Sequence, residues 1–142
     1  MSWRGCVVKT WSRTQSVIAL SSAEAEFYAL ISASAETLGL MTMLKEWGFP
    51  TEKGQMWGDA SAALGIINRK GLGKIRHLEV SHLWIQGLAA EKKLKYGKVA
   101  GSANPADMLT KSLEAVKRAE YLTQLNLHST EGRASIAPML HK

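Results

Sequence analysis

Three acidic residues of this 142-residue chain lie where carboxylates can act together on a phosphate ester. Glu26 falls in the first turns of an expected helix, Asp59 ends an expected strand, and Asp107 opens an expected short helix after a strand. In α/β proteins, the ends of strands and the loops beside them form binding sites. Carboxylates that converge there make an oxygen cage for Mg²⁺, and a pair of such ions can activate water against a phosphodiester.

Each of these residues also has an ordinary structural explanation. Glu26 alone is typical of a solvated helix position, Asp59 is also typical of a helix N-cap, and Asp107 suits a helix N-terminus. Glu24 is better explained as part of a cap, because Ser21-Ser22-Ala23-Glu24 has the S-x-x-E pattern of a capping box. From spacing alone the sequence predicts an α/β domain and leaves nucleic-acid binding open.

The elements that must position these residues alternate between strands and helices. Residues 6–11 and 16–20 are β-prone, and the capping box begins a helix that ends near Trp47, before Gly48 and Pro50. One face of this helix is apolar at three- and four-residue steps, at Phe27, Leu30, Ile31, Leu38, Met41 and Leu44. Further along the chain we expect a strand over 55–58, a helix over 62–67, a helix over 78–90, a strand over 94–100 and a helix over 113–125. The alternation predicts an α/β fold.

Length and composition favour one folded domain. The hydrophobic share of 46% and the charged share of 21% fit a globular chain rather than a disordered one, and we assign the domain to residues 1–127. Residues 128–142 are polar and aperiodic, which predicts a flexible tail. The chain opens almost directly onto an expected strand, so we expect a domain cut from a longer one, or a reading frame that begins inside it.

The charge balance and the single cysteine narrow the partners and the compartment. The net charge of +6 and the pI near 9.6 suit a polyanionic partner such as nucleic acid. Cys6 alone excludes an intrachain disulfide and a cysteine-rich zinc site, which fits an intracellular reducing compartment, the cytoplasm or nucleus. We expect no membrane partner, because no signal-peptide pattern or apolar run of spanning length stands out.

Four blocks of sequence resemble the ribonuclease H domain of copia-type LTR retrotransposon polyproteins. WSRTQ at 11–15 and IALSSAEAEFYAL at 18–30 are similar to the family's W-S-x-x-Q and A-L-S-S-x-E-A-E passage. DASAAL at 59–64 resembles D-N-x-S-A-I, and RHLEV at 76–80 resembles K-H-I-D-I. PADMLTK at 105–111 is similar to the A-D-[IM]-L-T-K ending. The blocks follow the family's order over residues 11–125.

The resemblance implies a ribonuclease H-like mixed sheet flanked by helices and hydrolysis of RNA in RNA–DNA hybrids with Mg²⁺ or Mn²⁺. In the intact element such a domain is fused to reverse transcriptase. The family's glutamate stands directly before an aromatic residue, which selects Glu26 over Glu24. By resemblance Glu26, Asp59 and Asp107 are the catalytic metal ligands, with Glu26 and Asp59 on one ion and Asp107 on the other.

The chain departs from the family where it matters most for catalysis. The family's first aspartate, which bridges both ions, has no counterpart, because residues 1–23 contain no Asp or Glu. The first strand and most of the second are expected to be missing with it. We therefore expect little or no hydrolysis by this chain. Ala60 stands where the family has Asn, which weakens expected substrate contacts, and His82 is one position away from the family's histidine, which favours a half-buried packing role.

Basic residues beside the blocks are candidates for phosphate contacts. Lys74, Arg76 and His77 follow a Gly-flanked turn, and Lys111 follows Asp107; the family fold would bring all four near the hybrid, although solvated charges explain them equally well. Lys92, Lys93 and Lys95 favour a solvated helix end, and the tryptophans favour packing. Two alternatives stay open: a non-catalytic remnant that binds nucleic acid or a partner, and a fragment without a stable fold.

Overall fold

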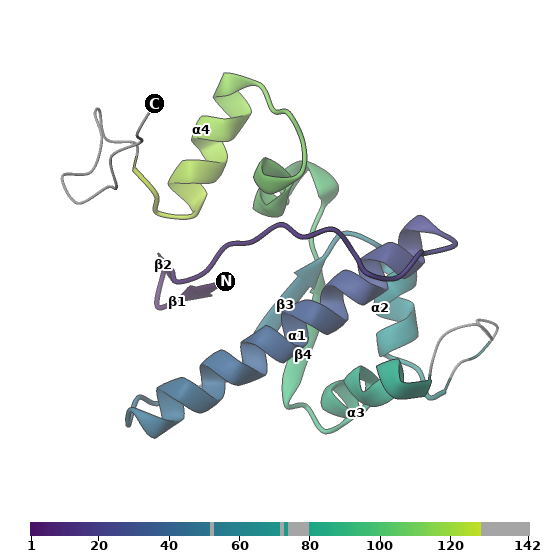
Figure 1. The fold of residues 1–142 in the computed structure, drawn as a ribbon. Coiled ribbons are helices and arrows are strands. Elements are labelled where there is room, and N and C mark those ends of the chain that lie inside the picture. The colour runs from purple at the N-terminus through teal and green to yellow at the C-terminus, as the bar shows by residue number, and fades with distance from the viewer. Residues whose placement is uncertain (52, 72, 74–79, 129–142) are drawn as a thin grey trace, which may run out of the picture. The chain divides into compact units, whose positions relative to one another are not determined.

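The computed structural model describes residues 1–51, 53–71, 73 and 80–128, in two compact units. The larger unit is Arg13–Asn104, and the smaller combines Met1–Ser12 with Pro105–Lys142. Figure 1 labels the elements, and each unit is described by itself. Because the two units are described separately, the assignment of residues 1–127 to a single domain stays a prediction.

Two parallel strands form the sheet of the larger unit. β3 (Gly54–Gly58) pairs with β4 (Leu94–Lys98) in a register that runs from Gly54↔Leu94 to Gly58↔Lys98. Parallel neighbours require a crossover, and here the crossover contains α2 (Ser61–Ile67), the 3-10 turn η1 (Val80–Leu83) and α3 (Trp84–Ala90). The predicted strand over 55–58 and helix over 62–67 are confirmed, and the chain is mixed α/β.

The long helix α1 (Ser22–Glu46) begins and ends on local signals. At its start, the backbone N–H of Glu24 donates to Ser21 Oγ at 3.2 Å, and the Glu24 carboxylate accepts from the backbone N–H of Leu20 at 2.9 Å. At its end, Gly48 has φ 77°, and the Gly48 and Phe49 N–H groups bond back to the carbonyls of Lys45 and Leu44. This is a Schellman ending. The predicted cap and the predicted stop are both confirmed.

Helix α1 covers one face of the strand pair and runs antiparallel to β3 (Figure 1). A Cβ added at Gly54 would lie 2.8 Å from Thr37 Cγ2, and one at Gly58 would lie 3.3 Å from Leu30 Cδ1. The two glycines therefore allow the helix to approach the strand closely. The buried core joins α1 to α2 and α3 through Phe27, Leu30, Ala63, Leu64, Ile66, Ile67 and Ile85.

Buried polar side chains tie the same elements together. Gln86 of α3 donates to the Ile66 carbonyl at 2.7 Å and to the Gly71 carbonyl at 3.1 Å, and it accepts from the Gly71 N–H at 2.9 Å. Ser34 of α1 donates to the Leu30 carbonyl, and its Oγ shares a hydrogen bond of 3.0 Å with the Tyr96 hydroxyl of β4. The pairings give the buried side chains of Gln86 and Ser34 hydrogen-bond partners.

By length and composition, α1 also passes for a membrane-spanning helix, contrary to the expectation that no such run exists. An 18-residue window of it has a mean hydropathy of 1.3. Core helices meet the same criterion, and Phe27 and Leu30 of this helix are buried against α2. Of that window, 22% is buried inside the structure.

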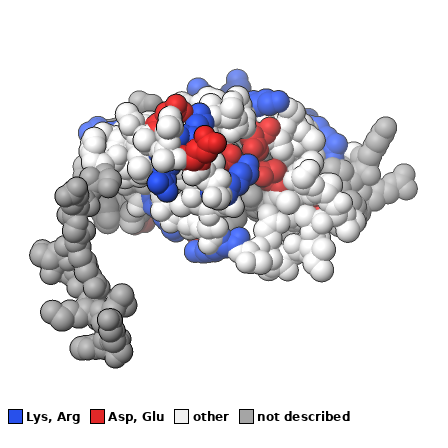
Figure 2. Space-filling model, turned by 90° about the horizontal axis from the view of Figure 1, so that it is seen from above, with Lys and Arg blue, Asp and Glu red and all other residues white. Residues whose placement is uncertain are grey.

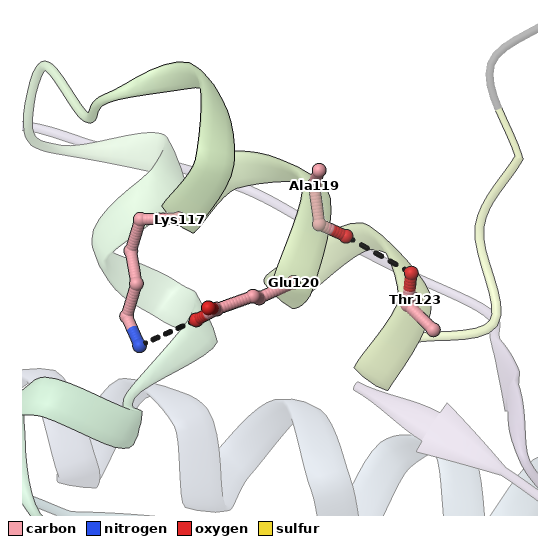
Figure 3. A network of polar contacts seen from close by, with 4 residues as sticks. All are labelled: Lys117, Ala119, Glu120 and Thr123. Carbon is pink, nitrogen blue, oxygen red and sulfur yellow. Dashed lines mark hydrogen bonds and ion pairs between the residues drawn. The ribbon is translucent and has the colours of Figure 1, made fainter.

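The smaller unit contains a short hairpin and two helical segments. β1 (Ser2–Trp3) pairs antiparallel with β2 (Cys6–Val7). The 3-10 helix η3 (Pro105–Leu109) is followed by α4 (Ala115–Gln124). On α4, Lys117 Nζ donates to Glu120 Oε2 at 2.8 Å, and Thr123 Oγ1 donates to the Ala119 carbonyl at 3.0 Å (Figure 3). Both hydrogen bonds are exposed, and each joins two residues of α4.

Several predicted boundaries are wrong. Residues 16–20 form bends rather than a strand, and Ile18 is 87% exposed, while only Cys6–Val7 of the expected 6–11 strand is paired. A β-prone segment is stabilised in the extended conformation by its neighbours in a sheet, and this segment has no paired strand beside it. The helix expected over 78–90 is η1 followed by α3, with 78–79 outside the described residues. The last strand ends at Lys98, because the 3-10 turn η2 (Gly101–Ala103) follows, and α4 begins at Ala115 instead of Leu113.

Candidate functional site

Asp59 directly follows the C-terminal end of β3. Its carboxylate Oδ2 lies 4.0 Å from the position that a Cβ on Gly101 would occupy, just beyond the end of β4. The N-cap of α2 is Ala60 and not Asp59, so the simple capping explanation of this aspartate does not hold. Within the described part of the chain, the Asp59 carboxylate makes no hydrogen bond or ion pair. It is a half-buried anion at the edge where sites form in parallel sheets.

Glu26 belongs to the end of α1 that meets the same edge of the sheet. Leu30 contacts Gly58, the last residue of β3, and Glu26 is one helical turn earlier on the same face. Its side chain is half-buried, whereas Glu24 is only 3% exposed and is held in the cap. The structure thus gives Glu24 the structural role that the capping box predicts.

Asp107 lies in η3 and belongs to the smaller unit, whereas Glu26 and Asp59 belong to the larger one. Its Oδ1 atom is 3.0 Å from Lys111 Nζ, and its carbonyl accepts the Lys111 backbone N–H at 2.9 Å. Lys111, a predicted phosphate contact, is thus ion-paired with a predicted metal ligand. That pairing reduces the charge that either group offers to another ion.

The Mg²⁺ or Mn²⁺ site that the resemblance implies stays a prediction, because Asp107 belongs to one unit and Glu26 and Asp59 to the other. Across the residues that the structure describes, no three His, Cys, Asp or Glu side chains lie together as a group able to hold a metal ion. The larger unit contributes Glu26 and Asp59, and two carboxylates are too few to offset the dehydration of Mg²⁺.

Lys98 is the feature of this edge that sequence reasoning missed. It ends β4, pairs in register with Gly58, and its Nζ atom donates to the hydroxyl of Ser61 in the first turn of α2. No local motif marks this lysine, because only the parallel register brings it beside the residue that precedes Asp59. The edge thus has a carboxylate and an ammonium that do not neutralise one another.

Other sequence-based candidates stand as follows. Lys74, Arg76 and His77 lie outside the described residues, so their phosphate contacts stay predictions. The His82 ring is half-buried and packs edge-on against Tyr28 with 5.1 Å between ring centroids, in agreement with the packing role. Figure 2 shows acidic and basic side chains interspersed on the face it presents, without one continuous basic patch.

Comparison with known proteins gives one informative relative. No family model matches the chain, and no solved structure matches it. The "Retrovirus-related Pol polyprotein from transposon TNT 1-94" of Nicotiana tabacum is 30% identical over 111 residues, which are 78% of this chain. The chain spans about 8% of the length of that polyprotein. The chain is therefore a homologue of one segment of a retrotransposon Pol polyprotein.

Proposed function

We propose that this chain is a retroelement-derived, ribonuclease H-type domain that binds RNA–DNA hybrids and hydrolyses them poorly or not at all. The observation that carries the proposal is the position of Asp59. Its carboxylate follows a parallel strand, has no protein partner among the described residues, and lies at the end of the sheet that Glu26 also approaches. The relationship to a Pol polyprotein supports a nucleic-acid substrate.

The sequence also argues for weak catalysis. In the family that it resembles, Mg²⁺ or Mn²⁺ would supply the activated water and stabilise the leaving oxygen. Residues 1–23 hold no counterpart of the family's first aspartate, the ligand shared by both ions, and Lys111 pairs with Asp107. With one carboxylate fewer than the family's four, the charge that offsets the dehydration of Mg²⁺ is reduced.

A binding measurement without divalent metal tests the first half of the proposal. We expect the fluorescence anisotropy of a fluorescein-labelled RNA–DNA hybrid to rise when the chain is added in EDTA. The affinity should fall as the salt concentration rises. Duplex DNA of the same sequence is the matched competitor, and hybrid should compete better. Weak binding at low salt, with no difference in affinity between the hybrid and duplex DNA, would contradict the proposal.

A non-catalytic remnant is the second candidate, and the lack of a counterpart to the family's first aspartate in residues 1–23 favours it. The two candidates differ in what Asp59 does. A ribonuclease H-type site predicts that Asp59→Asn tightens hybrid binding in EDTA, because the substitution removes an anion beside the phosphates. A remnant that binds through an unrelated surface predicts the same affinity for Asp59→Asn and for the wild type.

A further inference from the structure

Side chains alternate between the two faces of β4, so Lys98 and Lys95 point to opposite faces of the sheet. Leu94 is buried, Tyr96 reaches Ser34 of α1, and Lys98 reaches Ser61 of α2. Successive strand residues point to opposite faces, so Lys95 is on the other face of the sheet. Both lysines are exposed, and Lys95 is a natural control for Lys98.

The contact with Ser61 holds the Lys98 ammonium without cancelling its charge. A hydroxyl is neutral, and an ammonium has three donors, so donors remain for a further acceptor. In the described part of the chain, Lys98 makes no ion pair. Other lysines among the described residues pair with a nearby carboxylate, as Lys111 does with Asp107 and Lys117 with Glu120. Lys98 is a positioned cation whose charge is still available.

The neighbouring anion supplies the second part of the argument. Gly58 pairs with Lys98 in the register, and Asp59 is the next residue after Gly58. A polyanion that approaches Asp59 is repelled by the carboxylate and needs a fixed cation close by. Lys98 provides that cation at the same edge, from the adjacent strand.

We propose that Lys98, held by Ser61, is a phosphate-binding residue that contacts the backbone of the nucleic acid at the Asp59 edge. The inference rests on the proposed function, and it adds a residue that recognises a phosphodiester independently of any metal ion. Phosphate contacts fix the position of a nucleic acid without reading its sequence. Lys98 therefore contributes affinity and register and no base preference.

The test compares Lys98→Met with Lys95→Met in the full chain, by anisotropy with a labelled RNA–DNA hybrid in EDTA over a series of salt concentrations. Lys98→Met should weaken binding about five-fold at low salt and reduce the slope of log K against log salt by about one, because one phosphate contact is lost. Lys95→Met should change neither quantity by as much. Lys98→Arg should retain the wild-type slope, since it keeps the cation.

The outcomes separate this inference from the function on which it rests. Two results would overturn the role of Lys98 alone, provided that the wild type binds the hybrid. In the first, Lys98→Met and Lys95→Met have the same salt slope. In the second, the salt slope of Lys98→Arg is as low as that of Lys98→Met. A wild-type chain that fails to bind the hybrid at all would overturn the proposed function and the inference together.

Discussion

Lys111 Nζ lies 3.0 Å from Asp107 Oδ1, so one of the three candidate carboxylates already has a cation beside it, four residues further along the chain. The Lys111 side chain is 58% exposed and that of Asp107 is 14% exposed. An ion pair of this kind contributes modestly to stability, and it satisfies both charges locally. It bears on the phosphate-binding role that the sequence suggests for Lys111.

The first prediction concerns Lys111 as a phosphate contact. Because its charge is partly satisfied by Asp107, Lys111→Met should reduce hybrid affinity less than Lys98→Met does and should lower the salt slope by less than one-half. Anisotropy titrations of both variants check this. A loss for Lys111→Met as large as that for Lys98→Met would contradict it and would support the sequence-based assignment.

The second prediction separates two glutamates that are two residues apart. Glu24→Ala should lower the free energy of unfolding by about 1–2 kcal/mol, because the buried cap to Leu20 is lost. Glu26→Gln should change it by less than about 0.5 kcal/mol, as is usual away from caps and cores. Urea unfolding followed by circular dichroism measures both. Equal destabilisation would contradict the division of roles.

The third prediction concerns Gln86, which makes three hydrogen bonds from a buried position. Gln86→Leu should destabilise the chain by about 2–3 kcal/mol, because the N–H and carbonyl groups of Gly71 and the Ile66 carbonyl lose their side-chain hydrogen bonds. Gln55→Thr, at an exposed position of β3, is the control. The comparison again uses urea midpoints. A variant at Gln86 as stable as the control would show that these bonds contribute little.

The fourth prediction is a pH dependence at Tyr96. Burial raises the pKa of its phenol above the ordinary value of 10.0, and the hydrogen bond to Ser34 partly offsets this. A raised folded-state pKa means that the group's stabilising contribution is complete below pH 10 and is lost as the pH rises through the folded-state pKa. The free energy of unfolding of the wild type should therefore exceed that of Tyr96→Phe by about 0.5–1.5 kcal/mol near neutral pH, and this difference should shrink above pH 10. A difference that stays constant up to pH 11.5 would contradict this.

Local signals explain why some of the fold was predictable from sequence. The start and stop of α1 depend on Ser21, Glu24 and Gly48, which lie within a few residues of the helix ends, and both were predicted. The segment over 16–20 was predicted wrongly because a strand needs a neighbour, and sequence does not say whether one is present.

The candidate site was predictable only in part, for the same physical reason. Asp59 could be singled out from the sequence because it follows an expected strand and lies in a block that resembles the family; its role as a metal ligand stays a prediction. Lys98 has neither, and its proximity to Gly58 follows from a pairing between strands that are about 40 residues apart in the chain. The Lys111–Asp107 pair was within reach of sequence reasoning, because residues four apart are neighbours on a helical turn.

Hydrolysis of a hybrid tests the central claim most directly. A labelled RNA–DNA hybrid would be incubated with the wild type and with Glu26→Gln, in Mg²⁺ and separately in Mn²⁺, at concentrations where anisotropy shows the hybrid to be bound. We predict that RNA cleavage by the wild type is no faster than by Glu26→Gln, since residues 1–23 hold no counterpart of the family's first aspartate. Robust cleavage that Glu26→Gln abolishes would contradict the account.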